Sequence, residues 1–268
     1  MSRGGVKMKI FKLQEDPSYR FYNLDTYNVQ KYLSSYPYLQ DNKNYAICPY
    51  CGNPVAILYV ANKEHTDASI YARHVTNDVA GFPRINKQKL DHCLLSYNLV
   101  PFVPAASPIE AISLKSVNIS NLRKAFNSVT GISFSNYTTG EVLKNHHNAL
   151  SYRNVDSYNF YFSLLVDAKR FNLVNRYIWS NQIKKAITTK SRYFKLIGDK
   201  VVPKQKGIGD LRLEIKEYDF KDGYLPSITF EIYEQINETS SSPLISFKRY
   251  CFMYDGLVGE PTSTNEYF

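Results

Sequence analysis

The chain has 268 residues, of which 44% are hydrophobic and 21% charged, and its formal net charge is +9 at pH 7. These fractions are ordinary for a soluble protein, and no apolar run approaches the roughly 20 residues that a membrane span needs. The length suffices for one large domain or for two smaller ones, each with its own core.

The charge is unevenly distributed along the chain. Residues 1–209 carry 28 Lys and Arg against 13 Asp and Glu, whereas residues 210–268 carry 5 against 11. A basic body with an acidic C-terminal part is typical of some polyanion-binding proteins. This pattern favours a nucleic-acid partner without establishing one.

The N-terminal segment and the cysteines indicate a reducing compartment. Residues 1–13 are basic, and no apolar core follows them, so we expect no secretory signal. The chain has four cysteines, three of which we assign to a metal site below, and Cys251 is left alone. This is not the pattern of a disulfide framework, and we expect a cytoplasmic protein.

Residues 1–47 are interpreted as a tyrosine-rich lead-in, with one or two helical turns over 25–33. The strongest signal of the chain follows it. Cys48 and Cys51 are separated by Pro49 and Tyr50 and are followed by Gly52. Such a turn directs two thiolates the same way, and glycine tolerates the positive φ that a metal knuckle needs. The spacing predicts half of a tetrahedral zinc site.

The second half of the site must come from further along the chain. His74 and Cys93 supply it, which gives the predicted ligand set Cys48, Cys51, His74 and Cys93. His92 is a substitute for either of the last two ligands, and His65 is a more distant reserve. A closed Cys/His set leaves no coordination position for water, so the zinc is predicted to be structural.

A redox pair is the alternative interpretation of the two cysteines. A redox Cys-x-x-Cys typically follows a strand and begins a helix. Here the pair is followed by residues 55–60, whose sequence is typical of a strand, so zinc binding is favoured.

The Cys-x-x-Cys lead and the later Arg73-His74 step resemble zinc modules at the front of assorted bacterial and phage nucleic-acid-handling proteins. The resemblance covers about a sixth of the chain. It implies a protein of a bacterium, a phage or a mobile element, with a nucleic-acid or DNA-binding role. It carries over no catalytic residue.

Residues 99–119 are rich in proline and are predicted to be a connector. Helices follow: one over 121–129, capped by Ser120 and ended by Gly131, a second from Thr139 to Leu150, and a longer one over 158–187. The beginning of the third, residues 158–162, could equally be a strand.

From residue 193 the apolar period changes to two, which predicts strands over 193–197, 211–218, 227–236 and 244–254 in an antiparallel sheet. The predicted fold class is α+β: an N-terminal zinc-binding module made of a knuckle and short strands, a helical middle, and an antiparallel sheet in the C-terminal half. The expected domains are 1–98 and 120–268, joined by the connector.

Residues 184–206, called here the basic run, hold eight Lys and Arg against one acid, Asp199. Aromatic residues lie within or beside the run, and basic groups with aromatic faces suit single-stranded or irregular nucleic acid. The alternative is that these charges balance the acidic C-terminal sheet. The predicted nucleic-acid-binding residues are Trp179, Lys184, Lys185, Lys190, Arg192, Tyr193, Lys195, Lys204 and Lys206, with Phe194 as a further stacking candidate.

Two further functions remain as alternatives. Asp199, Glu214 and Lys216 approximate the pattern of a metal-dependent nuclease, in which carboxylates hold a divalent ion. Alternation places Glu214 and Lys216 on one face of a strand. The other alternative is a protein–protein adaptor that associates through its oppositely charged halves.

His146 and His147 are predicted to point to different helix faces, with Asp156 or Glu141 as possible partners for one of them.

Overall fold

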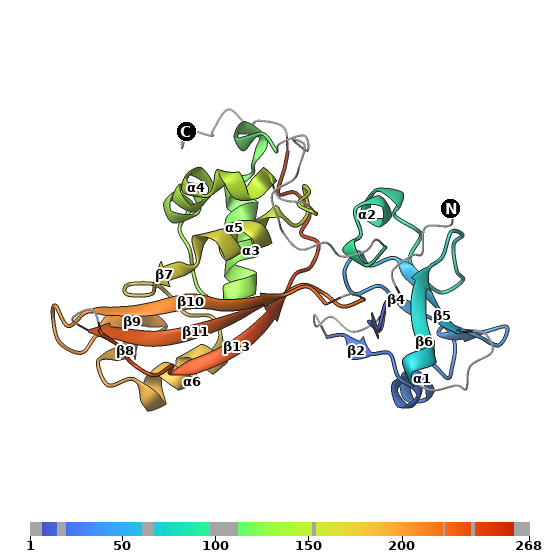
Figure 1. Cartoon of the computed structure of the whole chain (residues 1–268), viewed down its shortest axis with the longest axis horizontal. Helices are drawn as coiled ribbons and strands as arrows, with labels where there is room; N and C mark the ends of the chain where they lie inside the picture. Colours follow the sequence, from blue (N-terminus) through green and yellow to red (C-terminus); the bar gives the residue numbers. More distant parts are fainter. Residues whose placement is uncertain are drawn as a thin grey trace. The chain divides into compact units, whose positions relative to one another are not determined.

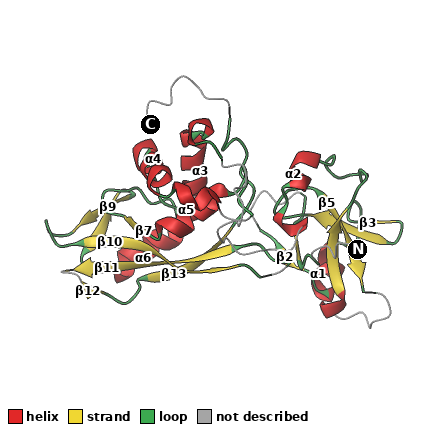
Figure 2. Cartoon of the chain, turned by 45° about the horizontal axis from the view of Figure 1, so that its top comes forward, coloured by secondary structure: helices red, strands yellow, loops and turns green. Residues whose placement is uncertain are grey.

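The computed structural model describes residues 7–14, 20–60, 67–96, 112–151, 154–221, 223–236 and 239–259. Within these residues the fold is mixed α+β, with six α-helices and antiparallel sheets (Figures 1 and 2). None of the described helices is both long and apolar enough to cross a membrane. The chain divides into two compact units: unit 1 comprises Met1–Pro101 and Phe220–Leu225, and unit 2 comprises Phe102–Asp219 and Pro226–Phe268.

Unit 1 is built on a four-stranded antiparallel sheet in the order β3-β4-β5-β6. Buried and half-buried residues alternate along β5, because successive side chains of a strand point to opposite faces. Val55 and Ile57 are buried, and Ala56 and Leu58 are half-buried. The elements of unit 1 are β1 (Ile10–Phe11), β2 (Tyr22–Asn23), α1 (Thr26–Tyr32), β3 (Leu39–Gln40), β4 (Lys43–Ile47), β5 (Pro54–Tyr59), β6 (Ile70–His74) and α2 (Lys87–Asp91), with 3₁₀ turns at Asp67–Ser69 and Leu94–Ser96.

Two local predictions in unit 1 are confirmed. The helical turns expected over 25–33 form α1, whose first backbone N–H groups are capped by Asp25: its carboxylate accepts from the N–H of Asn28 at 2.7 Å. The strand expected over 55–60 is β5. The N-terminal segment closes the core, since Met8 pairs with Ala72 and its side chain is fully buried.

Unit 2 combines a sheet with helices. In the sheet β10 pairs with β7 and β11, and β11 also pairs with β12 and β13. Helices α3, α4 and α5 gather over one side of this sheet (Figure 2). The elements are α3 (Ile119–Thr130), α4 (Asn136–Asn145), α5 (Phe160–Ala168), β7 (Arg170–Asn172), α6 (Asn181–Lys190), β8 (Phe194–Ile197), β9 (Lys200–Pro203), β10 (Asp210–Asp219), β11 (Ser227–Ile236), β12 (Thr239–Ser240) and β13 (Ile245–Tyr250), with 3₁₀ turns at Leu114–Ser116 and His147–Ser151.

The core of unit 2 lies between the sheet and the helices. Phe230 and Ile232 of β11 are fully buried and alternate with the less buried Glu231. From the helical side, the ring of Phe134 packs edge-on against those of Phe126 in α3 and Phe171 in β7, at centroid distances of 5.6 and 5.2 Å. Tyr161 of α5 is buried and donates its hydroxyl to the carbonyl of Phe252 at 2.8 Å.

The single helix predicted over 158–187 is wrong. The structure has α5, then β7, then α6 in that interval. Lys169 adopts φ 59° directly after α5, a positive φ that no residue of a right-handed helix has, so the helix ends there, and Phe171 then joins β7 opposite Leu213. The strand alternative for 158–162 is also wrong, because Phe160 begins α5.

The other two helix predictions are right about the elements, but both starts are wrong, and so is the end of the second helix. Helix α3 is capped by Asn118 rather than Ser120, and it ends at Gly131 with φ 73°, as predicted. Helix α4 begins at Asn136 behind the cap Ser135, earlier than the predicted Thr139. It ends at Asn145, before the predicted Leu150, and the 3₁₀ turn at His147–Ser151 follows it. Short polar side chains that compete as caps lie at several neighbouring positions, which makes the start ambiguous.

The C-terminal strands are found near their predicted places, but they belong to two sheets. Strand β8 pairs only with β9 among the described strands, in a separate hairpin, while β10, β11 and β13 form the larger sheet. The expected division into 1–98, a connector and 120–268 stays a prediction, because residues 97–111 lie outside the described residues.

Candidate metal centre and basic surface

A tight turn between β4 and β5 positions the first two cysteines. Cys48 directly follows β4, its N–H donates to the carbonyl of Asn53 at 2.9 Å, and its carbonyl accepts from the N–H of Gly52 at 3.0 Å. Gly52 has φ 76°, a conformation that favours glycine. The turn holds Cys48 and Cys51 on one side, and both thiols are buried.

The other two members come from the next elements of unit 1. His74 is the last residue of β6, and it lies opposite Val55 of β5, two residues beyond the turn. Cys93 follows α2, and its N–H donates to the carbonyl of Leu90 at 3.1 Å. Strand register and the end of a short helix therefore bring both side chains to the Cys48–Cys51 turn.

The four donor atoms lie close enough to bind one metal ion, within 4.8 Å of one another. The Sγ atoms of Cys48 and Cys93 are 3.7 Å apart, and Nε2 of His74 lies 3.3 Å from Sγ of Cys51 and 3.6 Å from Sγ of Cys93. In a tetrahedral zinc site, two sulfur atoms lie about 3.8 Å apart, and a sulfur and a nitrogen about 3.6 Å apart. The spacing is consistent with zinc.

The electrostatics of the cluster favour a bound cation. Burial raises the pKa of the Cys48 and Cys93 thiols well above the usual value, while hydrogen bonds from these two thiols lower the pKa of Cys51. Three adjacent buried thiols do not ionise together unless a positive charge lies beside them. A divalent ion supplies that charge, and the thiolates are the ligands it needs.

Polar side chains around the cluster orient its members. The other ring nitrogen of His74, Nδ1, lies 2.9 Å from Oγ of Ser96. The amide of Asn53 donates to Sγ of Cys51 at 3.3 Å and to the carbonyl of Asn86 at 3.1 Å, and its oxygen accepts from the N–H of Asn86 at 2.7 Å. Outer contacts of this kind fix the tautomer and the position of metal ligands.

The structure separates the candidate histidines. His74 belongs to the cluster, whereas His92 is exposed at the C-cap of α2 and lies outside it. His65 lies outside the described residues. Of the described residues, only Cys48, Cys51, His74 and Cys93 form a group of at least three possible metal ligands. Cys51 is followed by β5 and not by a helix, so the turn lacks the setting of a redox pair.

The basic run covers α6 and the β8–β9 hairpin of unit 2. Lys184 is half-buried and pairs with Asp199 at 2.6 Å, and the ammonium groups of Lys190 and Lys204 donate to the carbonyls of Leu244 and Ser191, both at 2.9 Å. The exposed basic residues of the run are Lys185, Lys190, Arg192, Lys195, Lys204 and Lys206.

The acidic strands of unit 2 form their ion pairs elsewhere. Glu234 of β11 is buried and accepts from the hydroxyl of Ser191 at 2.6 Å and from the N–H of Tyr193 at 2.9 Å, both neutral donors. Within the described part of the chain, no carboxylate of β10 or β11 pairs with a cation of the basic run. The cations that these strands use are Arg170, Arg212, Lys216 and Lys248.

The three aromatic candidates differ in accessibility. Trp179 is 61% exposed and Tyr193 is half-buried, whereas Phe194 is fully buried at the start of β8. Phe194 belongs to the core, and its prediction as a stacking residue is wrong. The aromatic residue nearest to it in sequence, Tyr193, keeps some accessible surface.

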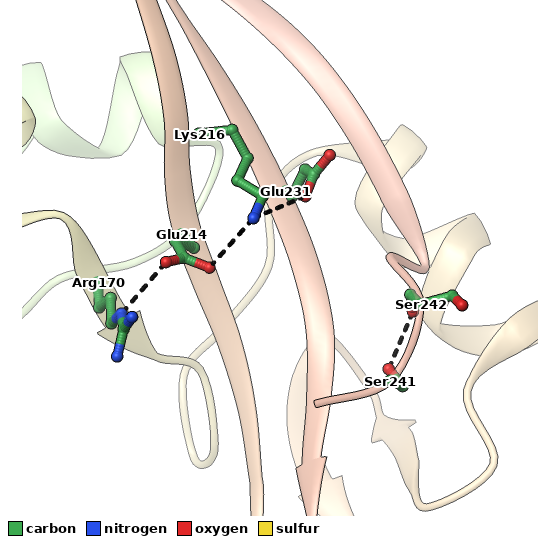
Figure 3. A network of polar contacts seen from close by, with 6 residues as sticks. All are labelled: Arg170, Glu214, Lys216, Glu231, Ser241 and Ser242. Carbon is green, nitrogen blue, oxygen red and sulfur yellow. Dashed lines mark hydrogen bonds and ion pairs between the residues drawn. The ribbon is translucent and has the colours of Figure 1, made fainter. Parts of the chain in front are cut away.

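The nuclease candidates fall into two separate ion-pair groups. Figure 3 shows Glu214 of β10 between Arg170, at 3.2 Å, and Lys216, at 3.8 Å, while Lys216 also lies 3.7 Å from Glu231 of β11. Glu214 and Lys216 share a face of the strand, as predicted. Asp199 lies in the turn between β8 and β9 and pairs with Lys184 instead. The carboxylates thus neighbour protein cations, and the nuclease alternative stays a prediction.

The same close-up includes the serine-rich segment after β12, where Oγ of Ser241 donates to the carbonyl of Ser242 at 2.9 Å (Figure 3).

The two neighbouring histidines have different partners. Nδ1 of His146 lies 2.7 Å from a carboxylate oxygen of Asp167, and Nδ1 of His147 lies 3.1 Å from the carbonyl oxygen of Lys144. His146 therefore has Asp167 as its partner, not the expected Asp156 or Glu141.

Comparison with protein-family models, curated protein sequences and solved structures gives no match for the chain. Sequence reasoning found the four members of the cluster but missed Asn53, Asn86 and Ser96, which support it. The Gly52-Asn53 step after the second cysteine was the available signal, because a buried asparagine beside thiolates needs partners for its amide.

Proposed function

We propose that Cys48, Cys51, His74 and Cys93 bind one structural zinc ion. The proposal is supported by the near-tetrahedral spacing of the donor atoms and by the burial of the three thiols. With three sulfur ligands and one nitrogen the coordination shell is complete, so no position remains for a reacting water. The ion would tie β4, β5, β6 and the end of α2 together. Its role is the folding of unit 1.

We further propose that the protein binds nucleic acid through the basic run. The observation that carries this proposal is that the acidic strands use other cations, so the exposed cations of the run are not neutralised by the sheet. Clustered Lys and Arg release counterions from phosphates, which supplies the sequence-independent part of nucleic-acid affinity. The chain's only tryptophan precedes the same helix, α6, and is open to solvent.

A single strand or an irregular nucleic acid is the partner that suits this surface. Base stacking on an aromatic ring requires a base that is not already stacked within a duplex. An exposed indole next to cations offers both interactions over a short distance along the chain. A regular duplex would use the cations but leave Trp179 without a base.

The test is a fluorescence-anisotropy titration of labelled single-stranded and duplex DNA and RNA at two salt concentrations. We expect tighter binding to single strands, with an affinity that falls as salt rises. Replacing Lys185, Arg192 and Lys195 together with glutamine should weaken binding and reduce the salt slope by about 2, at about 0.7 per lost phosphate contact. Lys184 is kept, because its partner Asp199 would lose its cation.

A charge-matched control separates local contacts from net charge. Replacing Lys115, Lys144 and Lys169, which are exposed in unit 2 outside the basic run, with glutamine removes the same charge from other surfaces and should leave the affinity within about two-fold, since screened distant charges contribute little. Equal losses in both triple variants, or no binding at low salt, would refute the assignment of the basic run. Shortened product on a gel after Mg²⁺ addition would support the nuclease alternative instead.

A further inference from the structure

A groove of about 530 Å³ lies beside Trp179 in unit 2. Its walls come from the C-terminal half of α3, from the segment that enters α6 and from β13, which are distant in sequence. Apart from Gly131, the residues that line it are Lys124, Asn127, Ser128, Trp179, Ser180 and Arg249. A volume of this size lies within the range of small-ligand sites and is enough for one nucleotide unit.

The backbone at Trp179 is fixed while its side chain is open. The N–H groups of Trp179 and Ser180 both donate to the carbonyl of Gly131, at 2.8 and 3.1 Å, and the preceding Ile178 is fully buried. The indole ring of Trp179 is 61% exposed, so most of its surface is accessible to a ligand. Rigid aromatic platforms lose little entropy when a ligand stacks on them.

The charged groups that line the groove are both cations. The ammonium of Lys124 lies 3.2 Å from the side-chain oxygen of Asn121, and the guanidinium of Arg249 lies over the ring of Phe247 at 4.7 Å. Partial burial lowers the pKa of Arg249, because the protein removes part of the water that solvates its charge. An anion in the groove would compensate this cation.

Two other cavities, one in unit 1 and one in unit 2, have a carboxylate in the wall. The cavity beside His74, about 330 Å³ in volume, includes Asp78 with Arg73 in its wall. The cavity between the end of α6 and β12, about 660 Å³, includes the buried Glu234 together with Lys190 and Arg192. A carboxylate in the wall repels phosphate. The groove at Trp179 combines an exposed aromatic ring with cations and has no carboxylate among its lining residues.

We infer that this groove binds one nucleotide of a single-stranded nucleic acid, with the base stacked on Trp179 and the backbone phosphate held by Lys124 and Arg249. The inference rests on the proposed nucleic-acid-binding function and adds a specific contact site to it. The cations of the basic run would then contact neighbouring phosphates. Stacking tolerates any base, so we expect little sequence preference at this position.

The test uses Trp179 as its own reporter, since the chain has one tryptophan. Short oligothymidylate is titrated into the full-length protein while the indole emission is followed, and the same oligomer carrying a label is followed by anisotropy. We expect the emission to be quenched with the same dissociation constant that anisotropy gives. Trp179→Ala should weaken binding by roughly ten-fold or more, and Trp179→Phe by less, because phenylalanine keeps a stacking face.

The cations are tested by Lys124→Gln and Arg249→Gln, each compared with Lys144→Gln on α4. Tyr137, which is 69% exposed on α4, supplies the matched aromatic control Tyr137→Ala. We expect three- to ten-fold weaker binding for the groove variants and unchanged binding for the controls. Because Arg249 is half-buried, its variant is used only if its thermal transition is unchanged, and Lys124→Gln carries the test otherwise.

The outcomes distinguish this inference from the proposed function. Salt-sensitive binding without quenching, together with unchanged affinity of the Trp179 and Lys124 variants, would overturn the groove and leave nucleic-acid binding through the basic run intact. No binding of any oligomer would overturn both. Quenching by thymidine monophosphate as strong as that by the oligomer would replace the polymer with a free nucleotide as the ligand.

Discussion

Oγ of Ser96 lies 2.9 Å from Nδ1 of His74, while the Nε2 atom of the same ring faces the thiols of Cys51 and Cys93. If a metal binds Nε2, the neutral ring carries its proton on Nδ1, and this N–H donates to Ser96. In that arrangement the hydroxyl accepts the hydrogen bond and holds the ring with Nε2 toward the thiols. Ser96, which follows α2, thus orients His74, the last residue of β6, for metal binding.

The first prediction follows from that hydrogen bond. Ser96→Ala should retain the four ligands but lower metal affinity by about 10- to 100-fold, because His74 loses the hydrogen bond that holds its ring in place. Competition with a chromogenic chelator measures the effect. Ser116→Ala, in which the lost hydroxyl donates only to the nearby carbonyl of Ser113, is the control. Equal retention of metal in both variants would show that the Ser96 contact does not support the site.

The second prediction concerns the identity of the ligands. His74→Ala and Cys93→Ser should lose most of the bound metal, measured as zinc per chain by elemental analysis, since each removes one of four donors. His92→Ala and Cys251→Ala should retain a full equivalent, because His92 is exposed outside the cluster and Cys251 is buried in unit 2. Loss of metal in His92→Ala with retention in His74→Ala would contradict the geometry.

The candidate metal centre was largely predictable from the sequence, because ligand types at fixed spacings are a local signal. The choice between His74 and His92 was not, since it depends on the register that places His74 opposite Val55 next to the cysteine turn. The contribution of Ser96 was not predictable either. Serine hydroxyls have many partners in loops, and only the fold brings this one to the ring of His74.

The fold was predictable where the apolar period is clear. Strand β11 has the predicted bounds, and Ile228, Phe230 and Ile232 alternate with polar residues along it. The interval 158–187 was predicted wrongly. Apolar residues recur there at helical spacing, yet the positive φ of Lys169 ends the helix, and Phe171 pairs with Leu213 in the sheet. Tertiary packing outweighs local periodicity in such a segment.

The third prediction concerns metal removal, and the two units should respond differently. A strong chelator should abolish the cooperative folding of unit 1, because structural zinc contributes folding free energy directly. Far-UV circular dichroism should report this loss, and added Zn²⁺ should restore the signal. Unit 2 contains none of the four ligands and holds Trp179, so the denaturation transition followed by tryptophan fluorescence should not move. A shift of that transition on chelation would contradict the assignment of the metal to unit 1.

The fourth prediction tests the support of Trp179 through Gly131. This residue ends α3 with φ 73°, and a Cβ added to it would lie 2.7 Å from Cβ of Ser180, the cap of α6. Gly131→Ala should therefore destabilise unit 2 by at least about 1–2 kcal/mol, the cost of a left-handed conformation for a residue with a Cβ. It should also weaken oligonucleotide binding, because the carbonyl of Gly131 accepts the N–H groups of both Trp179 and Ser180.

Gly140→Ala is the matched control for this substitution. Gly140 lies inside α4, its backbone is helical, and an added Cβ meets no atom within 4 Å. Alanine there should stabilise unit 2 by about 0.5–1 kcal/mol, because glycine loses more backbone entropy than alanine when a helix forms. Urea denaturation followed by Trp179 emission measures both variants. Opposite shifts of the transition midpoint are expected, whereas a neutral Gly131→Ala would mean that α3 and α6 do not depend on this left-handed turn.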